Sequence, residues 1–253
     1  MKLCVIPARG GSKRIPRKNI RLFAGQPIIA WSIQAALETG LFDRVMVSTD
    51  DEEIAEVARK YGAETPFMRP GDLADDYTGT NPVVKQAIRW HEEHGIPVEI
   101  ACCLYATAPF VQASDLRAGH DRLLASGKSF VFSVTSFSFP IQRALRLNAR
   151  GEVEAMYPEY RATRSQDLEP AWHDAGQFYW GQGKAFLDDE ILFSPLSLPQ
   201  VLPRHRVQDI DTEEDWLRAE LMFAVQQARG SSRVVDVSVL TKPASTICED
   251  RSE

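Results

Sequence analysis

Residues 5–20 read VIPARGGSKRIPRKNI, and this stretch indicates the first strand of the fold and the loop that follows it. Its start continues a short apolar run from Leu3 to Ile6, which is typical of a buried strand. Pro7 then stops the strand, and Gly10 and Gly11 let the backbone turn so closely that its amide groups can approach a ligand. The pattern predicts a strand with a ligand-binding loop at its carboxyl end.

The loop is strongly basic, since Arg9, Lys13, Arg14, Arg17 and Lys18 surround the two glycines. An amide-lined loop with this charge suits a polyanion, above all a nucleoside triphosphate. The loop is not a P-loop, because the spacing G-x-x-x-x-G-K-[ST] is absent, and it does not match G-x-G-x-x-G. A merely solvated basic loop is the alternative, but it leaves the paired glycines unexplained.

Strands and helices alternate along the chain up to about residue 135. This alternation predicts a single-domain, Rossmann-like α/β fold with a mostly parallel sheet, helices on both faces and ligands at the carboxyl ends of the strands. We expect helices over residues 27–40, 50–61, 81–95, 114–127 and 212–230. We expect strands at Leu3–Ile6, Val45–Ser48, Ala63–Met68, Ile100–Tyr105, Phe130–Val134, Phe178–Trp180, Leu198–Leu202 and Val207–Ile210.

The composition narrows the class of protein. The chain has 253 residues, of which 44% are hydrophobic and 25% charged, and its formal net charge is −6. An acidic chain of this kind is not expected to bind nucleic acid in general. We expect no membrane span and no signal peptide, because no apolar run is long enough. Cys4, Cys102 and Cys103 lie in apolar runs and are expected to be free core thiols, as in a reducing cytoplasm.

The pattern changes between residues 136 and 172. Ala144–Leu147 and Glu152–Met156 flank the polar residues 148–151, which predicts a hairpin that either covers the surface or contacts another chain. We assign residues 1–229 to one domain and residues 230–253 to a tail, in which Val234–Leu240 is a further candidate strand.

A pair of acidic residues, Asp209 and Asp211, precedes the final helix. In a strand, residues two apart point to the same side, so the two carboxylates can hold one Mg²⁺ between them and a triphosphate. The alternative is that the pair caps the helix beginning at Thr212, which is plausible for Asp211 in particular.

The loop from Ala8 to Asn19 resembles AxGGSKRIPxKN, the signature of the sugar-acid cytidylyltransferases, which activate sialic acids as CMP-sugars. The stretch QDIDTEEDW at residues 208–216 is also similar to that family, and the resemblance extends from residue 1 to about 229. It implies a fold of the nucleotide-diphospho-sugar transferase type, CTP and a nine-carbon sugar acid as substrates, and a catalytic Mg²⁺ on Asp209 and Asp211. It also implies that residues 136–172 form a dimerisation arm, which makes the protein a homodimer.

One departure from the family pattern bears on the sugar. In LYATAPF, residues 104–110, Tyr105 stands where the sialic acid enzymes carry a glutamine. This stretch, together with residues 75–80 and 174–180, resembles the branch that activates pseudaminic acid, although the aromatic residues of the last stretch also suit plain core packing. N-acetylneuraminate and then the eight-carbon acid 3-deoxy-manno-octulosonate are the alternatives. A non-catalytic relative would be expected to lack the loop lysine or the acidic pair, and both are present.

The resemblance also implies individual roles. The anomeric hydroxyl of the sugar would attack the α-phosphorus of CTP, with Lys18 and Arg9 offsetting charge as pyrophosphate leaves. Asn19 would contact cytidine or its ribose, and the base for the sugar hydroxyl stays open between a metal-bound hydroxide and Asp211. Arg164 suits the sugar carboxylate, unless it is only a surface arginine, and Asp50 is either a hydroxyl contact or a helix cap. The full set expected to bind substrates is Ala8, Gly10, Gly11, Ser12, Lys13, Asn19, Arg69, Thr80, Tyr105, Thr107, Arg164, Gln166, Asp174 and Gln177.

Overall fold

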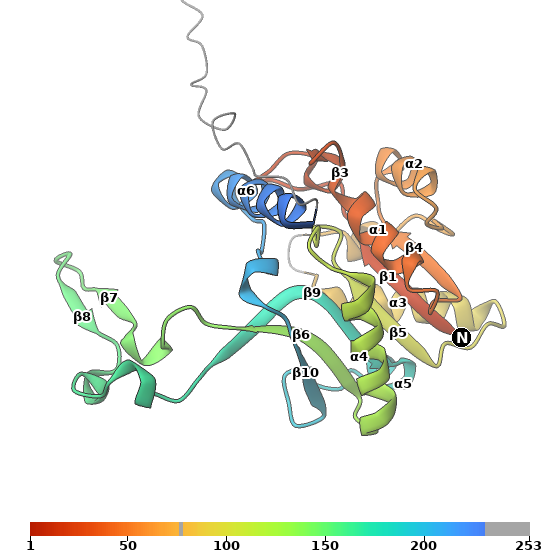
Figure 1. The fold of residues 1–253 in the computed structure, drawn as a ribbon. Helices are drawn as coiled ribbons and strands as arrows, with labels where there is room; N and C mark the ends of the chain where they lie inside the picture. The colour runs from red at the N-terminus through yellow and green to blue at the C-terminus, as the bar shows by residue number, and fades with distance from the viewer. Residues whose placement is uncertain (76–77, 231–253) are drawn as a thin grey trace, which may run out of the picture.

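The central element of the fold is a six-stranded sheet with the strand order β10-β6-β9-β5-β1-β4 (Figure 1). The structure is a computed structural model that describes residues 1–75 and 78–230. The strands are β1 (Lys2–Pro7), β4 (Arg44–Ser48), β5 (Ile100–Leu104), β6 (Phe130–Ser136), β9 (Trp172–Gln182) and β10 (Ser197–Val201).

The sheet is mostly parallel, as predicted. β1 pairs in parallel with β4 and β5, and β6 pairs in parallel with β10. Strand β9 runs antiparallel to both of its neighbours, β5 and β6, and so joins the two parallel halves. The carboxyl ends of β1 and β5 therefore lie side by side at one end of the strands. The antiparallel strand β9 begins next to them.

Helices cover both faces of the sheet, which confirms the predicted architecture. On one face, Cys4 and Ile6 of β1 share a buried cluster with Ile29 and Ile33 of α1. On the other face, alternate strand residues such as Val5 pack against α3. The first face carries α1 (Ile28–Glu38), α2 (Glu52–Lys60) and α4 (Ala113–Ser126), and the second carries α3 (Thr80–Glu93) and α5 (Gly183–Leu187).

The last helix, α6 (Glu213–Gly230), packs against the start of the chain and not against the sheet. Phe23, from the short hairpin of β2 (Leu22–Phe23) and β3 (Gln26–Pro27), meets Trp216 and Phe223 of α6 edge to face, with ring centroids 5.6 and 5.3 Å apart. Because this buried cluster also holds Ile15 and Ile210, it fixes the basic loop beside the residues that precede α6.

A long arm separates β6 from β9. Its tip is the predicted hairpin, formed by β7 (Leu145–Leu147) and β8 (Val153–Ala155), and Figure 1 shows it projecting far from the sheet. Short 3₁₀ turns at Ile141–Arg143, Pro158–Tyr160 and Ser165–Asp167 complete the arm. The structure contains one chain, so a role of the arm in dimerisation stays a prediction.

Two predicted strands are wrong. Within Ala63–Met68 only Glu64 bridges to Met46, since Pro66 has no amide hydrogen for a ladder. Residues Val207–Ile210 follow a 3₁₀ turn at Arg204–Arg206 and pair with no strand among the described residues, because the chain leaves the sheet there to reach α6. The candidate strand Val234–Leu240 lies outside the described residues.

Two further expectations concern cysteines and membranes. Cys4, Cys102 and Cys103 are buried and free, as predicted. Within residues 1–75 and 78–230, no helix combines the length and the apolar character needed to cross a bilayer.

Candidate active site

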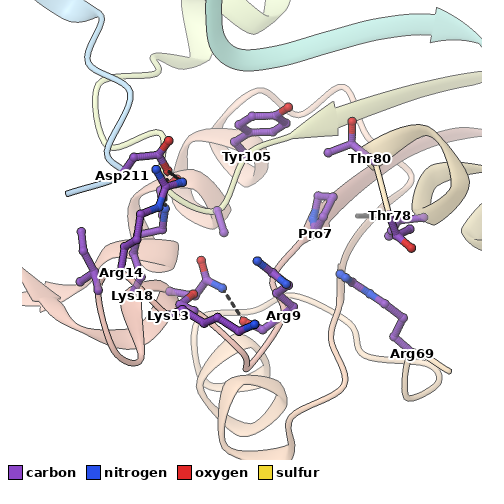
Figure 2. Close-up of a pocket in the computed structure, with 17 residues that line it drawn as sticks. Pro7, Arg9, Lys13, Arg14, Lys18, Arg69, Thr78, Thr80, Tyr105 and Asp211 are labelled. Atoms are coloured by element: carbon purple, nitrogen blue, oxygen red, sulfur yellow. Dashed lines mark hydrogen bonds and ion pairs between the residues drawn. The ribbon is translucent and has the colours of Figure 1, made fainter. Parts of the chain in front are cut away.

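A cleft of about 300 Å³ opens at the carboxyl ends of β1 and β5 (Figure 2). The basic loop, the loop after β5, the start of α3 and the residues before α6 all contribute to its walls. It is lined by Pro7, Arg9, Ser12, Lys13, Arg14, Ile15, Lys18, Asn19, Arg69, Thr78, Gly79, Thr80, Val83, Tyr105, Ala106, Thr107 and Asp211. The predicted ligand edge of the sheet and the predicted basic loop therefore coincide.

On one side of the cleft, the basic loop contacts the residues that precede α6. The ammonium group of Lys18 donates to the carbonyl oxygen of Ile210 at 2.6 Å and lies 3.3 Å from Asp211 Oδ1. The guanidinium of Arg14 lies 3.0 Å from the same oxygen. Figure 2 shows Arg14, Lys18 and Asp211 together on this side, with Arg69 and Thr78 on the opposite one. The result is a patch of net positive charge.

Gly10 lets the loop pass close to the start of α2. Its amide donates to Asp50 Oδ1 at 2.9 Å, and a Cβ at this position would lie 2.7 Å from Asp51 Oδ2. Asp51 caps α2 by accepting from the Ile54 amide, and it forms an ion pair with Arg17, whose hydrogen bond lowers the pKa of the Asp51 carboxyl. Of the two roles considered for Asp50, the helix cap belongs to Asp51, and Asp50 instead supports the loop.

Two buried polar side chains shape the floor of the cleft. Asn19 is only 7% exposed, and its Nδ2 donates to the carbonyl oxygen of Arg9 at 2.9 Å. Arg69 is equally buried; its Nε donates to Ser48 Oγ at 3.0 Å, and its terminal nitrogen donates to the Ser48 carbonyl oxygen. Burial lowers the pKa of Arg69. Both residues thus sit in a fixed orientation beside the basic loop.

Tyr105 forms the wall between Thr80 and Thr107. Its amide donates to the Gln177 carbonyl oxygen at 2.8 Å, and its own carbonyl oxygen accepts from Ser32 Oγ at 2.8 Å. Burial raises the pKa of the Tyr105 hydroxyl, which therefore stays neutral. A neutral hydroxyl is the polar group that this wall offers to a ligand.

Comparisons with known proteins agree with this geometry. The family model described as Cytidylyltransferase matches residues 3–184. A pseudaminic acid cytidylyltransferase of Campylobacter jejuni is 47% identical over 223 residues, which cover 88% of this chain and 96% of that protein. The chain belongs to the cytidylyltransferase family. A CMP-N,N'-diacetyllegionaminic acid synthase of Legionella pneumophila is 33% identical to this cytidylyltransferase, over 89% of the chain and 97% of that protein.

The fold of this cytidylyltransferase is also found among solved structures. A CMP:2-keto-3-deoxy-manno-octonic acid synthetase complexed with CTP superposes with a TM-score of 0.65 over 89% of this chain and 99% of that one. At 15% sequence identity this likeness shows the fold alone. It agrees with the nucleotide-diphospho-sugar transferase type expected from the sequence.

The acidic pair of the cytidylyltransferase is placed by an extended loop and not by a strand, so the argument from strand alternation does not apply. Asp211 lines the cleft, whereas Asp209 is exposed at its margin. Partial burial and the nearby Asp211 carboxylate raise the pKa of Asp209, while Lys18 lowers it. Neither side chain caps α6: Thr212 and Asp215 do so, because each accepts a hydrogen bond from the other's amide, at 3.2 and 2.9 Å.

Several predicted residues of the cytidylyltransferase do not line the cleft. Ala8 is buried, the amide of Gly10 is bonded to Asp50, and Gly11 is exposed. Arg164 and Gln166 lie on the exposed arm, where Arg164 pairs with Asp167 at 2.6 Å.

Gln177 is buried and its Nε2 donates to the Arg206 carbonyl oxygen at 2.6 Å. Asp174 accepts from Tyr179 and from the Gly176 amide. Arg9, Ser12, Lys13, Lys18, Asn19, Arg69, Thr80, Tyr105, Thr107 and Asp211 are brought together.

The cleft of the cytidylyltransferase also contains residues that were not singled out from the sequence as binding residues. Thr78 and Gly79 precede α3 in the stretch resembling the pseudaminic acid branch, and Arg14 belongs to the basic loop. For these three the sequence signal was present. Ala106 likewise belongs to the quoted stretch 104–110, whereas no pattern in the sequence marks Val83, which lies within α3.

Proposed function

We propose that this enzyme transfers CMP from CTP to pseudaminic acid, releasing pyrophosphate and forming CMP-pseudaminic acid for bacterial surface glycans. The observation that carries the proposal is the 47% identity to the Campylobacter jejuni pseudaminic acid cytidylyltransferase over 96% of that protein. The basic cleft supports it, because a triphosphate needs several cations within reach of one another.

The phosphate half of the reaction is assigned to the basic loop. Lys13, Arg14 and Lys18 line the cleft and offset the charge on the α-phosphate and on the leaving pyrophosphate. Lys18 is held by the Ile210 carbonyl oxygen, so its ammonium group keeps its position when substrate arrives. Asn19 and Arg9 fix the loop backbone on which CTP lies.

The acidic pair fits a magnesium ion. Mg²⁺ binds through one or two carboxylates together with substrate phosphates and water. Asp211 faces the cleft, and desolvation, followed by the charge of Asp211, raises the pKa of Asp209. A carboxyl group whose ionisation is disfavoured by its surroundings, as that of Asp209 is, gains from a bound hard cation. When bound, the metal would supply charge neutralisation at the phosphates. Asp209 and Asp211 would hold it, and Arg14 and Lys18 orient Asp211.

The sugar half of the cleft is assigned to Tyr105, Thr80 and Thr107, which line it together with the basic loop. The sugar's anomeric hydroxyl would reach the α-phosphorus from this side, in line with the departing pyrophosphate. Arg69, which is buried and fixed by Ser48, provides a positive charge for the sugar carboxylate.

We also propose that the enzyme is a cytoplasmic homodimer formed through its arm. Phe139 and Leu147 of the arm are 80% and 72% exposed, and Leu145 and Val153 are both 63% exposed. Such a concentration of exposed apolar side chains is typical of an interaction surface. In the dimer, Arg164 and Gln166 would reach the sugar in the partner's cleft, since they belong to the arm and do not line the cleft of their own chain.

Pyrophosphate release tests the proposed function. The full-length enzyme is supplied with CTP and Mg²⁺ and with pseudaminic acid or N-acetylneuraminic acid at matched concentrations. We expect release to depend on both sugar and Mg²⁺ and to be faster with pseudaminic acid. Preference for N-acetylneuraminic acid would overturn the choice of sugar and keep the chemistry, whereas no release with either acid would contradict the proposed function.

A further inference from the structure

A row of polar side chains runs from the wall of the cleft into the protein. The ring of Tyr105, which lines the cleft, lies 5.3 Å from the ring of Tyr179 between centroids. The buried hydroxyl of Tyr105 lies near those of Tyr179 and Thr80, both of which act on its pKa. The Tyr179 hydroxyl in turn donates to Asp174 Oδ2 at 2.5 Å. Asp174, which does not line the cleft, is thus connected to a residue that does.

An irregularity in β9 makes this connection possible. Residues five apart in a regular strand point to opposite faces of the sheet, so Asp174 would not reach Tyr179. Here two steps along β6, from Phe132 to Val134, correspond to five steps along β9, from Tyr179 back to Asp174. Gly176 adopts a φ of +60°, and its amide donates to Asp174 Oδ1 at 2.9 Å. The bulge therefore turns the Asp174 carboxylate towards Tyr179.

The direction of the hydrogen bonds in this row follows from counting protons. A carboxylate only accepts, so the single proton of Tyr179 is committed to Asp174. The Tyr179 oxygen is left to accept, and the proton of Tyr105 is the one available to it. Burial, followed by the neighbouring Tyr105 and Asp174, raises the pKa of Tyr179, and burial likewise raises that of Tyr105, so both hydroxyls keep their protons.

We propose that Asp174 is a positioning residue for sugar recognition, because through Tyr179 it makes Tyr105 present an acceptor, and not a donor, to the cleft. This assignment rests on the proposed function. A substrate group that meets the Tyr105 oxygen must then donate a hydrogen bond, as the N–H of an acylamino group or a hydroxyl does, while an ether or carbonyl oxygen at this position is rejected. The Tyr105 side of the cleft thereby selects substrates that donate a hydrogen bond at this position.

The substitution Asp174→Asn reverses the direction of the hydrogen bonds in this row and keeps the shape of the side chain. The Gly176 amide needs an acceptor, so the asparagine keeps its oxygen there and turns its NH₂ group to Tyr179. Tyr179 then donates to Tyr105, and the Tyr105 proton is freed for Thr80 or for a ligand in the cleft. We expect the KM for the sugar acid to rise about tenfold, with the KM for CTP changed less than about twofold. Asp121→Asn on the exposed surface of α4 is the matched control and should change neither constant.

A double-mutant cycle with Tyr105→Phe separates positioning from a general structural effect. If Asp174 acts through the Tyr105 hydroxyl, Asp174→Asn should have almost no further effect on the sugar KM in the Tyr105→Phe background. A full, additive tenfold effect in that background would overturn the proposal. Thermal unfolding of each variant, with and without CTP, checks that the fold and the nucleotide site are retained.

Failure of this inference differs from failure of the proposed function. If the wild-type enzyme uses another sugar acid, the proposed sugar is wrong, but the same cycle run with that acid still decides the role of Asp174. If pseudaminic acid is the substrate and the cycle is additive, the proposed function holds and the positioning role is wrong. Absence of turnover with any sugar acid overturns both.

Discussion

At the scale of single residues, Asp211 is the carboxylate that connects the residues before α6 with the basic loop. Its Oδ1 meets both Arg14 and Lys18 at the cleft, and its side chain is 38% exposed. Ion pairs this exposed contribute little to stability, so the carboxylate's position is better explained by function.

We predict that Asp211→Ala lowers turnover by at least about a hundredfold, since a metal ligand at the phosphates is lost. The melting temperature should change by no more than about 2 °C. Pyrophosphate release and thermal unfolding measure the two effects. Glu213→Ala, which removes the partner of Arg21 on the neighbouring surface, is the control and should leave turnover intact. Near-normal turnover of Asp211→Ala would exclude the metal assignment.

The raised pKa of Asp209 gives a second prediction at this scale. The folded protein holds the Asp209 proton more tightly than the unfolded chain, so the stability from this group is present below about pH 4 and is lost as the pH rises through the folded pKa. Asp209→Asn should therefore be slightly more stable than wild type at pH 7, by at most about 0.5 kcal/mol because the residue is exposed.

Urea unfolding at several pH values without metal checks this sign, and the difference between Asp209→Asn and wild type should shrink towards pH 4. Added Mg²⁺ should stabilise the wild type more than Asp209→Asn, because the variant has lost a ligand. An equal effect of Mg²⁺ on both proteins would remove Asp209 from the metal site.

At the scale of elements, the start of α6 supports the cleft. Thr212 and Asp215 form a capping box, and Asp215 Oδ2 also accepts from the amide of Asp211 at 3.2 Å. We predict that Asp215→Ala destabilises the protein by about 1 kcal/mol through the lost cap. It should also raise the KM for CTP several-fold, since the Asp211 backbone loses its anchor. Thermal unfolding and steady-state kinetics measure both effects.

The neighbouring Glu214→Ala is the control for this element, because Glu214 lies in the same first turn of α6 without taking part in the capping box. It should leave the KM for CTP unchanged. If Asp215→Ala lowered stability without any change in that KM, the helix start would have no role in holding Asp211.

The elements that the sequence predicted well are those whose signals are local. Gly40 and Gly127, where two of the predicted helices were expected to end, adopt positive φ values of +62° and +64°. The helix predicted from residue 50 is present and is capped by Asp51. The elements predicted wrongly depend on partners far away in the sequence. Val207–Ile210 was predicted as a strand, but Ile210 is buried against α6 and not in the sheet.

The same distinction applies to the candidate site. The basic loop was predicted from its own composition, and ten of the predicted residues meet in the cleft. Gln177 and Asp174 were placed among the ligand contacts because residues 174–180 resemble the pseudaminic acid branch. The β9 bulge, which turns one into the interior and the other towards Tyr179, leaves no signal in the sequence beyond Gly176.

At the scale of the whole molecule, the arm exposes several large apolar side chains to solvent. We predict that the wild-type protein sediments as a dimer, and that the double substitution of Leu145→Glu and Val153→Glu gives a monomer, because charges at 63% exposed apolar positions oppose burial in an interface. Leu124→Glu, at an equally exposed position on α4, is the control and should remain dimeric. A wild-type protein that sediments as a monomer at micromolar concentration would contradict the proposed dimer.

The arm connects two strands that are already neighbours. β6 and β9 remain paired up to Ser136 and Trp172, so the arm is topologically an oversized loop of a β-hairpin. A short Asn-Gly turn is the natural closure for such a pair. Excision of residues 137–171 with this closure would leave the strand order and the cleft's own residues unchanged. The chain thus offers protein engineering a single cassette whose removal would take away the proposed dimer surface, together with Arg164 and Gln166, and keep the nucleotide half of the cleft.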